Sequence, residues 1–335
     1  MTDSGRFQVR ALSWMIVRSI LRWVCPASVV AVLAAVTWRL GTGPFLDGVR
    51  AINGGALAAA AAIFLLTTTC CAWRWRIVAS GLGVDVSRAA AVVAYYRCLF
   101  LNLTLPGGVA GDVHRGVSHG RDVKDVGHAL RAVVWERTAG QVVQVVLTVS
   151  VLFVLPSPLR PAMPFVAAAL AATAVVVVLV LRGRTQRGRS RLDRVRNAVM
   201  SDIRGVLLHK RALPAVALLS IVTVLGHVLT FLIAAHAVGV TAPVSRLLPL
   251  AFISMIAMAL PNIGGWGPRE GVTAWTFFAA GLGADRGAAT AVAYGVMVLA
   301  ASLPGGLVLV VEWLSRRRAS RPGLQRHVTD TRYAR

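Results

Sequence analysis

Apolar runs long enough to cross a lipid bilayer recur along the chain and are separated by arginine-rich segments. A membrane-crossing helix needs roughly 20 mostly apolar residues. We predict six full spans, at about 24–38, 51–72, 129–155, 163–181, 212–238 and 288–313. A hydrophobic content of 56%, a charged content of 15% and a mean hydropathy of +0.68 fit this interpretation. The sequence therefore predicts an all-α fold, a polytopic membrane helix bundle.

The charge of the chain is strongly positive, at +23. A basic soluble domain would suggest nucleic acid, but here the cations lie between and after apolar runs, which is the positive-inside pattern. We therefore expect no nucleic acid, a location in the plasma (inner) membrane, and a cytoplasmic N-terminus (1–23) and C-terminal tail (316–335). The tail is basic and is expected to be disordered. A cleaved signal peptide is the alternative to a retained first span.

The segment 182–211 is the most basic part of the chain, with ten Lys or Arg residues. Its apolar residues recur at helical spacing, with arginines on other faces. We expect an amphipathic helix that lies on the anionic inner leaflet, with a solvated loop as the alternative. The apolar positions are Leu192, Val195, Val199, Ile203 and Val206.

Two glycine-rich breaks interrupt apolar runs, at 105–116 and at 260–271, and each carries charged residues. The apolar pieces beside them are short; the seventeen residues of 89–105 cover roughly 25 Å as a helix. The basic loops mark the cytoplasmic side of the membrane. On that basis, we expect the first break to enter from the cytoplasm and the second from outside. We thus predict two opposed re-entrant or broken-helix hairpins, the geometry of inverted-repeat transporters. Irregular backbone at this depth requires a protein-lined or wet cavity.

Each break is expected to start a helix, with Asp112 as N-cap of the first, and Gly267 and Pro268 as N-cap and N1 of the second. Helix N-termini bind phosphate, and Arg115 and Arg269 would neutralise it. The alternative is that Asp112 and Glu270 serve only the helix ends and that the glycines only allow tight packing.

Charged side chains within membrane segments are costly and are functional candidates by default. We expect Asp112 to pair with Arg137, and Glu136 with Arg115 or Arg97. The candidate binding residues are Asn102, Pro106, Gly107, Gly108, Gly111, Asp112, Arg115, Glu136, Arg137, Pro261, Gly264, Gly265, Gly267, Arg269 and Glu270.

Signatures of catalysis and metal binding are not recognised in the sequence. His114, His119 and His128 lack the spacing and acidic neighbours of a zinc site, and His227 is expected to be a hydrogen-bonded core group. A nucleophile elbow and a Walker loop are also missing. We therefore expect no catalytic residue, no metal and no cofactor.

The motifs around the two breaks resemble the transmembrane region of lysylphosphatidylglycerol synthase, also called the flippase-like domain family, over about 24–315. The resemblance implies an inner-membrane protein related to domains that move aminoacylated phosphatidylglycerol between leaflets. It also implies a stand-alone member without the soluble aminoacyl transferase domain. It is carried by 100–108 with Gly111, Asp112 and Arg115, by Glu136 and Arg137, by 260–271, and by Gly305 and Gly306.

These observations favour a lipid translocator for an anionic or aminoacylated phospholipid, or a related lipid-linked headgroup. A membrane-embedded lipid or polyprenyl-sugar transferase, with Asp112 or Glu136 as base, and a non-catalytic partner subunit are the alternatives. The expected partners are a phospholipid or lipid-linked substrate and, through 182–211, anionic inner-leaflet lipid. A homo-oligomer or a separate synthase is left open.

Overall fold

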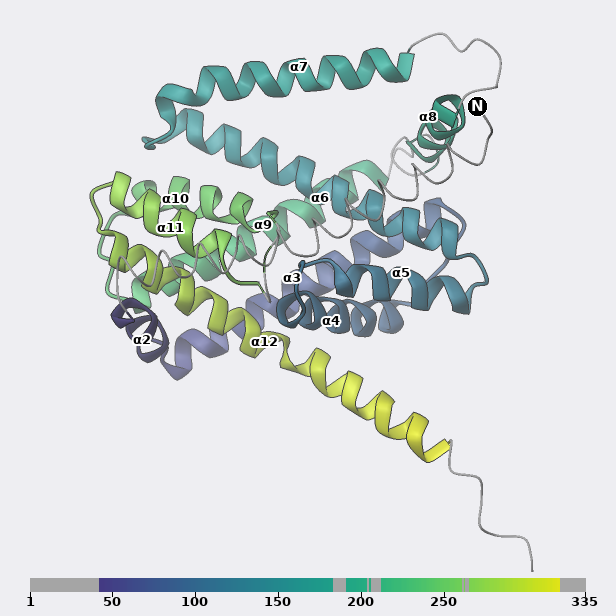
Figure 1. Cartoon of the computed structure of the whole chain (residues 1–335), viewed down its shortest axis with the longest axis horizontal. Helices are drawn as coiled ribbons and strands as arrows, with labels where there is room; N and C mark the ends of the chain where they lie inside the picture. The colour runs from purple at the N-terminus through teal and green to yellow at the C-terminus, as the bar shows by residue number, and fades with distance from the viewer. Residues whose placement is uncertain are drawn as a thin grey trace, which may run out of the picture.

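The computed structural model describes residues 42–182, 191–203, 205, 212–260, 262 and 265–319, which form a helix bundle (Figure 1). The predicted all-α fold is confirmed. The helices are α2 (Gly43–Arg50), α3 (Gly54–Gly81), α4 (Arg88–Thr104), α5 (Ala110–Asp122), α6 (Val126–Val154), a 3-10 turn η1 (Arg160–Ala162), α7 (Met163–Arg182), α8 (Arg191–Asp202), α9 (Ala212–Ala237), α10 (Val244–Ala257), α11 (Pro268–Ala279) and α12 (Ala284–Ala319).

Five of these helices, α3, α6, α7, α9 and α12, are long and apolar enough to cross a membrane. They correspond to the second to sixth predicted spans. The predicted first span (24–38), the N-terminal segment 1–23 and residues 320–335 lie outside the described residues. Residues 316–319, the start of the predicted disordered tail, instead continue α12.

The end of α3 differs from the prediction. The second span is predicted to end at residue 72, but the helix continues through 73–76, Trp-Arg-Trp-Arg, to Gly81. Trp73 is exposed, whereas Arg74 and Trp75 are buried at 5% and 1% exposure. Alternation along a helix explains the difference, because adjacent side chains point about 100° apart. Arg74 thus belongs to the interior of the bundle.

Two pairs of short helices, α4 with α5 and α10 with α11, form the hairpins expected at the breaks. They have 17, 13, 14 and 12 residues, and a few irregular residues join the members of each pair. In Figure 1 the α4–α5 hairpin enters the bundle from one end and the α10–α11 hairpin from the other. Their tips face each other in the middle of the bundle.

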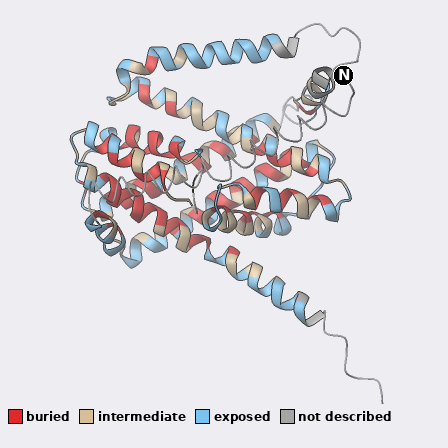
Figure 2. Cartoon of the chain, in the orientation of Figure 1, coloured by how far each residue is buried: buried red, intermediate tan, exposed pale blue. Residues whose placement is uncertain are grey.

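Buried residues gather in the middle of the bundle (Figure 2). One apolar cluster joins α3, α9, α10, α11 and α12 around Phe231, Phe277 and Tyr294, and a second joins α3, α4 and α6 around Trp75 and Tyr95. In contrast, α7 is apolar along its length, yet only 6% of the residues in its most apolar stretch are buried. An apolar helix that is exposed in this way is suited to face lipid.

The predicted amphipathic helix in 182–211 is partly described, as α8. Its last residue, Asp202, is 5% exposed and accepts hydrogen bonds from Arg131 and from Trp135 Nε1, the latter at 2.9 Å. Both partners belong to α6, so α8 is attached to the bundle by a buried carboxylate. Residues 183–190, 204 and 206–211 lie outside the described residues.

Candidate functional site

The tips of the two hairpins touch. The backbone N–H of Gly107 donates a hydrogen bond of 2.8 Å to the carbonyl oxygen of Asn262. Gly108, at φ +66°, lies so close that a Cβ atom there would be 2.8 Å from Asn262 Nδ2. The two breaks, about 150 residues apart in the sequence, therefore meet at one place. Pro261 and Gly264, which we had included in the site, lie outside the described residues.

The N-terminus of α5 is built differently from the prediction. The N-cap residue is Val109, and Asp112 lies in the first turn of the helix. Asn102, on α4, provides the missing acceptor, because its Oδ1 receives the N–H of Gly111 at 2.8 Å. Since Asn102 satisfies that donor from outside the helix, the carboxylate of Asp112 is available for arginine.

The N-terminus of α11 follows the prediction, with Gly267 as N-cap and Pro268 at the first helical position. Glu270 Oε2 accepts the N–H of Gly267 at 2.6 Å, and Glu270 Oε1 pairs with the neighbouring Arg269. Arg269 also lies over the rings of Trp266 and Tyr294, 5.6 and 5.1 Å from their centroids. At the start of each helix, one backbone N–H is thus already bonded to a side chain of the protein. The positive charge of the site therefore comes mostly from its arginines.

The buried carboxylate of Glu136 links α6 to three other helices, α3, α4 and α5. It is fully buried and pairs with Arg74, which donates from Nε at 2.9 Å, and with Arg115, which donates at 3.0 Å. Tyr95 is the third partner and donates a hydrogen bond at 2.8 Å. The pairing of Glu136 with Arg115 was predicted, whereas its pairing with Arg74 was not. Arg115 lies between the rings of Trp75 and Tyr95.

The predicted pair of Asp112 and Arg137 is present. Arg137 donates to the two carboxylate oxygens of Asp112 at 3.0 and 2.6 Å, a bidentate arrangement. Arg137 nevertheless keeps 39% of its side chain exposed. Arg97, the other predicted partner of Glu136, instead pairs with Glu312 on α12 at 2.5 Å.

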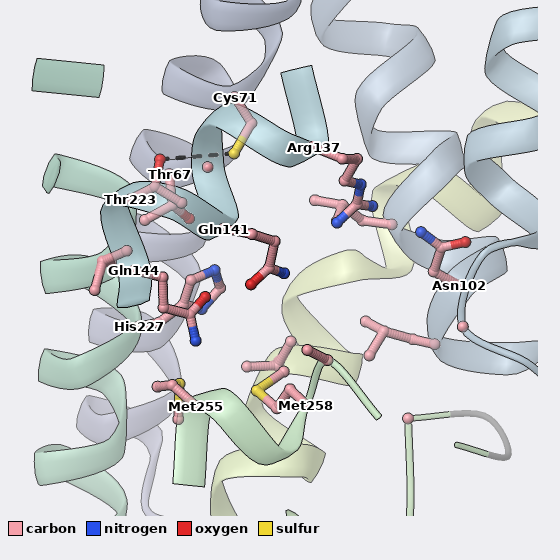
Figure 3. A pocket seen from close by; sticks show the side chains of 18 of the residues that line it. Thr67, Cys71, Asn102, Arg137, Gln141, Gln144, Thr223, His227, Met255 and Met258 are labelled. Carbon is pink, nitrogen blue, oxygen red and sulfur yellow. Dashed lines mark hydrogen bonds between the residues drawn. The ribbon is translucent and has the colours of Figure 1, made fainter. Parts of the chain in front are cut away.

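A cavity of about 220 Å³ lies where the hairpin tips meet α3, α6 and α9. Figure 3 shows Arg137 and Asn102 on one side of it and Thr223, His227 and Gln144 on the opposite side. Gln141 lies between the two sides. The methionines Met255 and Met258, from α10 and the residues after it, lie along a third wall.

Only part of the predicted site lines this cavity. The lining includes Asn102, Gly108, Arg137, Gly265 and Arg269. The other described members of the predicted set are not in contact with it: Pro106, Gly107, Gly111, Asp112, Arg115, Glu136, Gly267 and Glu270. Several of these hold the lining arginines in place through the ion pairs described above.

The remaining polar lining was not part of the predicted site. Arg74, Gln141, Gln144, Thr68 and Thr223 all contact the cavity. His227 was expected to be a hydrogen-bonded core group; its Nδ1 lies 2.9 Å from the hydroxyl of Tyr294, and the ring also lines the cavity. Single polar residues inside apolar spans were the available signal, because a polar group in a span needs a partner or water.

The ionic groups around the cavity do not balance. Four cations, Arg74, Arg115, Arg137 and Arg269, stand against the three anions Asp112, Glu136 and Glu270. Among the described residues, one positive charge is left over. In addition, Arg269 Nη1 is buried without a hydrogen-bond partner among the described residues. A buried donor of this kind is costly unless a ligand or water satisfies it.

Five candidate spans, two facing hairpins and an arginine-lined cavity between them define the chain as a polytopic membrane protein. The family model described as the lysylphosphatidylglycerol synthase TM region matches residues 20–306. The chain therefore belongs to this family. No curated protein and no solved structure matches it.

Proposed function

We propose that the protein is a lipid translocator that holds the headgroup of an anionic phospholipid, or a related lipid-linked headgroup, in the cavity between the two hairpin tips. The acyl chains stay in the bilayer while the headgroup passes. Translocation down a concentration gradient needs no energy source in this chain. The observation that carries the proposal is the single surplus positive charge around a cavity that both breaks line.

The cations favour a phosphodiester, which carries one negative charge. Arg137 lines the cavity with a partly exposed side chain, and Arg269, also in the lining, has a buried guanidinium nitrogen without a partner among the described residues. Arginine is the residue best suited to phosphate because its planar fork donates two parallel hydrogen bonds. The volume of about 220 Å³ is below the range of roughly 300–1,000 Å³ for drug-sized ligands, so it suits a headgroup and not a whole lipid.

The position of the carboxylates supports a translocator over a transferase. A transferase would need Asp112 or Glu136 as a base in contact with its substrate. Neither residue lines the cavity, and both are held by arginines. Their geometry suits a structural role, in which they position the arginines that face the headgroup.

Further parts of the proposal rest on the sequence and on the family. A plasma-membrane location with both termini in the cytoplasm rests on the arginine distribution. Binding of 182–211 to anionic inner-leaflet lipid rests on its basic composition. A homo-oligomer or a separate synthase that supplies the lipid remains part of the proposal, as does the re-entrant path of the hairpins through the bilayer.

The test uses the purified full chain in phosphatidylcholine vesicles that contain a trace of fluorescent acyl-labelled phosphatidylglycerol. Dithionite quenching measures how fast inner-leaflet lipid reaches the outer leaflet. We expect Arg137→Gln and Arg269→Gln to slow this exchange about tenfold or more, because a charge-assisted hydrogen bond contributes about 1.5–3 kcal/mol.

The matched control is Arg246→Gln, an exposed arginine at the start of α10 that is not in the cavity lining. It should leave the rate unchanged. Unchanged rates in both cavity variants, with normal gel-filtration profiles, would overturn the proposal.

A further inference from the structure

The charge of the cavity lining has one sign. Among the described residues, its ionic side chains are Arg74, Arg137 and Arg269, and the lining contains no Asp or Glu. The nearby carboxylates Asp112 and Glu136 bind arginines from behind the lining. A ligand in the cavity therefore meets positive charge with no exposed carboxylate beside it.

The wall opposite Arg137 is polar but uncharged. Gln144, His227 and Thr223 lie there, and Gln141 lies between this wall and Arg137 (Figure 3). The side-chain amides of Gln141 and Gln144 make no hydrogen bond within the described part of the chain. The hydroxyl of Thr68, which is 1% exposed and also in the lining, has no partner there either.

Such groups complement hydroxyls. An amide offers both two donors and an acceptor, and a threonine hydroxyl both donates and accepts, so each can pair with a ligand hydroxyl in either direction. Gln141 is exposed and Gln144 partly exposed, so their amides are accessible to a ligand, whereas the hydroxyl of Thr68 is buried and gains most from a ligand that satisfies it. An uncharged polyol joined to a phosphodiester matches the two sides of the cavity, phosphate at Arg137 and hydroxyls at Gln144.

A headgroup that bears an amine matches the cavity poorly. Its ammonium would lie within a small site that already holds three arginines, without a carboxylate to pair with. Like charges close together in a desolvated site are unfavourable, and they strongly reduce binding of the wrong partner.

We propose that the cavity selects phospholipids whose headgroup is an uncharged, hydroxyl-bearing group such as glycerol, and that it discriminates against amine-bearing and aminoacylated headgroups. This inference rests on the proposed function and narrows its substrate class. The selected lipid differs from the aminoacylated lipid after which the family is named.

The experiment compares three lipids with the same fluorescent acyl chain, each as a trace in phosphatidylcholine vesicles with the full chain. They are phosphatidylglycerol, phosphatidylethanolamine and lysylphosphatidylglycerol. We expect phosphatidylglycerol to cross at least about tenfold faster than the two amine-bearing lipids, given the cost of uncompensated like charge.

Two variants at one position make the test specific. Gln144→Glu places a carboxylate on the uncharged wall and should raise the rate of lysylphosphatidylglycerol relative to phosphatidylglycerol about tenfold. Gln144→Leu, which has similar size and no charge, should slow phosphatidylglycerol without helping the amine-bearing lipids. Arg246→Gln serves again as the control.

The outcomes separate the two proposals. Equal or faster crossing of lysylphosphatidylglycerol in the unmodified chain, still slowed by Arg137→Gln, would overturn the selectivity and leave translocation standing. Crossing of all three lipids that is independent of Arg137 would overturn translocation at this cavity, and the selectivity with it. A Gln144→Glu variant that folds normally but keeps the original preference also contradicts the selectivity.

Discussion

Gly107 donates its backbone N–H to the carbonyl oxygen of Asn262 at 2.8 Å, and this bond joins the tips of two hairpins that enter the bundle from opposite ends. It satisfies polar backbone groups in two segments that are not helical. Any motion that separates the tips must break this bond. The contact between the tips therefore marks where the bundle would open if the headgroup passes between them.

Substitution at the first tip should separate backbone strain from loss of this contact. Gly107 and Gly108 both have positive φ, at +96° and +66°, but a Cβ at 107 meets nothing within 4 Å, whereas one at 108 meets Asn262. We expect Gly107→Ala to cost about 1–2 kcal/mol from strain alone, and Gly108→Ala to cost more. Thermal unfolding in detergent measures both variants.

A double variant provides the control for the contact. In an Asn262→Ala background, the side chain that Gly108→Ala would strike is gone. The costs of the two alanine substitutions should then become similar. If Gly108→Ala remains worse than Gly107→Ala by the same margin, contact with the Asn262 side chain is not the cause.

The buried carboxylate of Glu136 should be the most important ionic group for stability. Glu136→Gln leaves Arg74 and Arg115 without their shared partner in a fully buried position, and losing one member of a buried pair costs about 3–5 kcal/mol. Glu312→Gln breaks the Arg97 pair, where Glu312 is 34% exposed, so we expect a loss of about 1 kcal/mol or less. Melting temperatures in detergent give the order; the reverse order would contradict this account of the network.

The helices and two ion pairs could be predicted from the sequence. Apolar runs set the positions of α6, α7 and α9 to within a few residues, and the glycine-rich breaks set the two hairpins. The pair of Asp112 and Arg137 followed from charge balance within membrane segments, where each ionic group needs a partner.

Other parts of the site depend on contacts that no local pattern records. Arg74 follows the predicted end of the second span, and only the packing of α3 against α6 shows that it meets Glu136. Asp112 was predicted to be the N-cap of α5. The side chain that accepts the N–H of Gly111 is instead Asn102, which comes from the preceding helix. Gln141 and Gln144 carried no sequence signal beyond being polar within a span.

Close packing at the start of α5 should make Gly111 intolerant of any side chain. A Cβ there would lie 2.0 Å from the carbonyl oxygen of Cys98, which is backbone and cannot move without shifting α4. We expect Gly111→Ala to destabilise the bundle strongly, by about 3 kcal/mol at the upper end of overpacking costs. Gly127→Ala, where the nearest atom is 3.5 Å away, is the matched control and should have little effect. Equal melting temperatures for the two variants would contradict the close approach of α5 to α4.

The attachment of α8 to α6 should depend on one carboxylate. Asp202 is 5% exposed and receives hydrogen bonds from Arg131 and Trp135. Asp202→Asn removes the charge that pairs with Arg131, so we expect backbone amides of α8 to exchange with deuterium at least about tenfold faster, while those of α6 stay protected. The neighbouring Ser201→Ala is the control, because Ser201 is exposed and its hydroxyl donates to the carbonyl oxygen of Ala198 in its own helix. Unchanged exchange in α8 of the Asp202→Asn variant would mean that other contacts hold this helix. Trp135→Phe would then show whether the indole N–H contributes to holding α8 on α6.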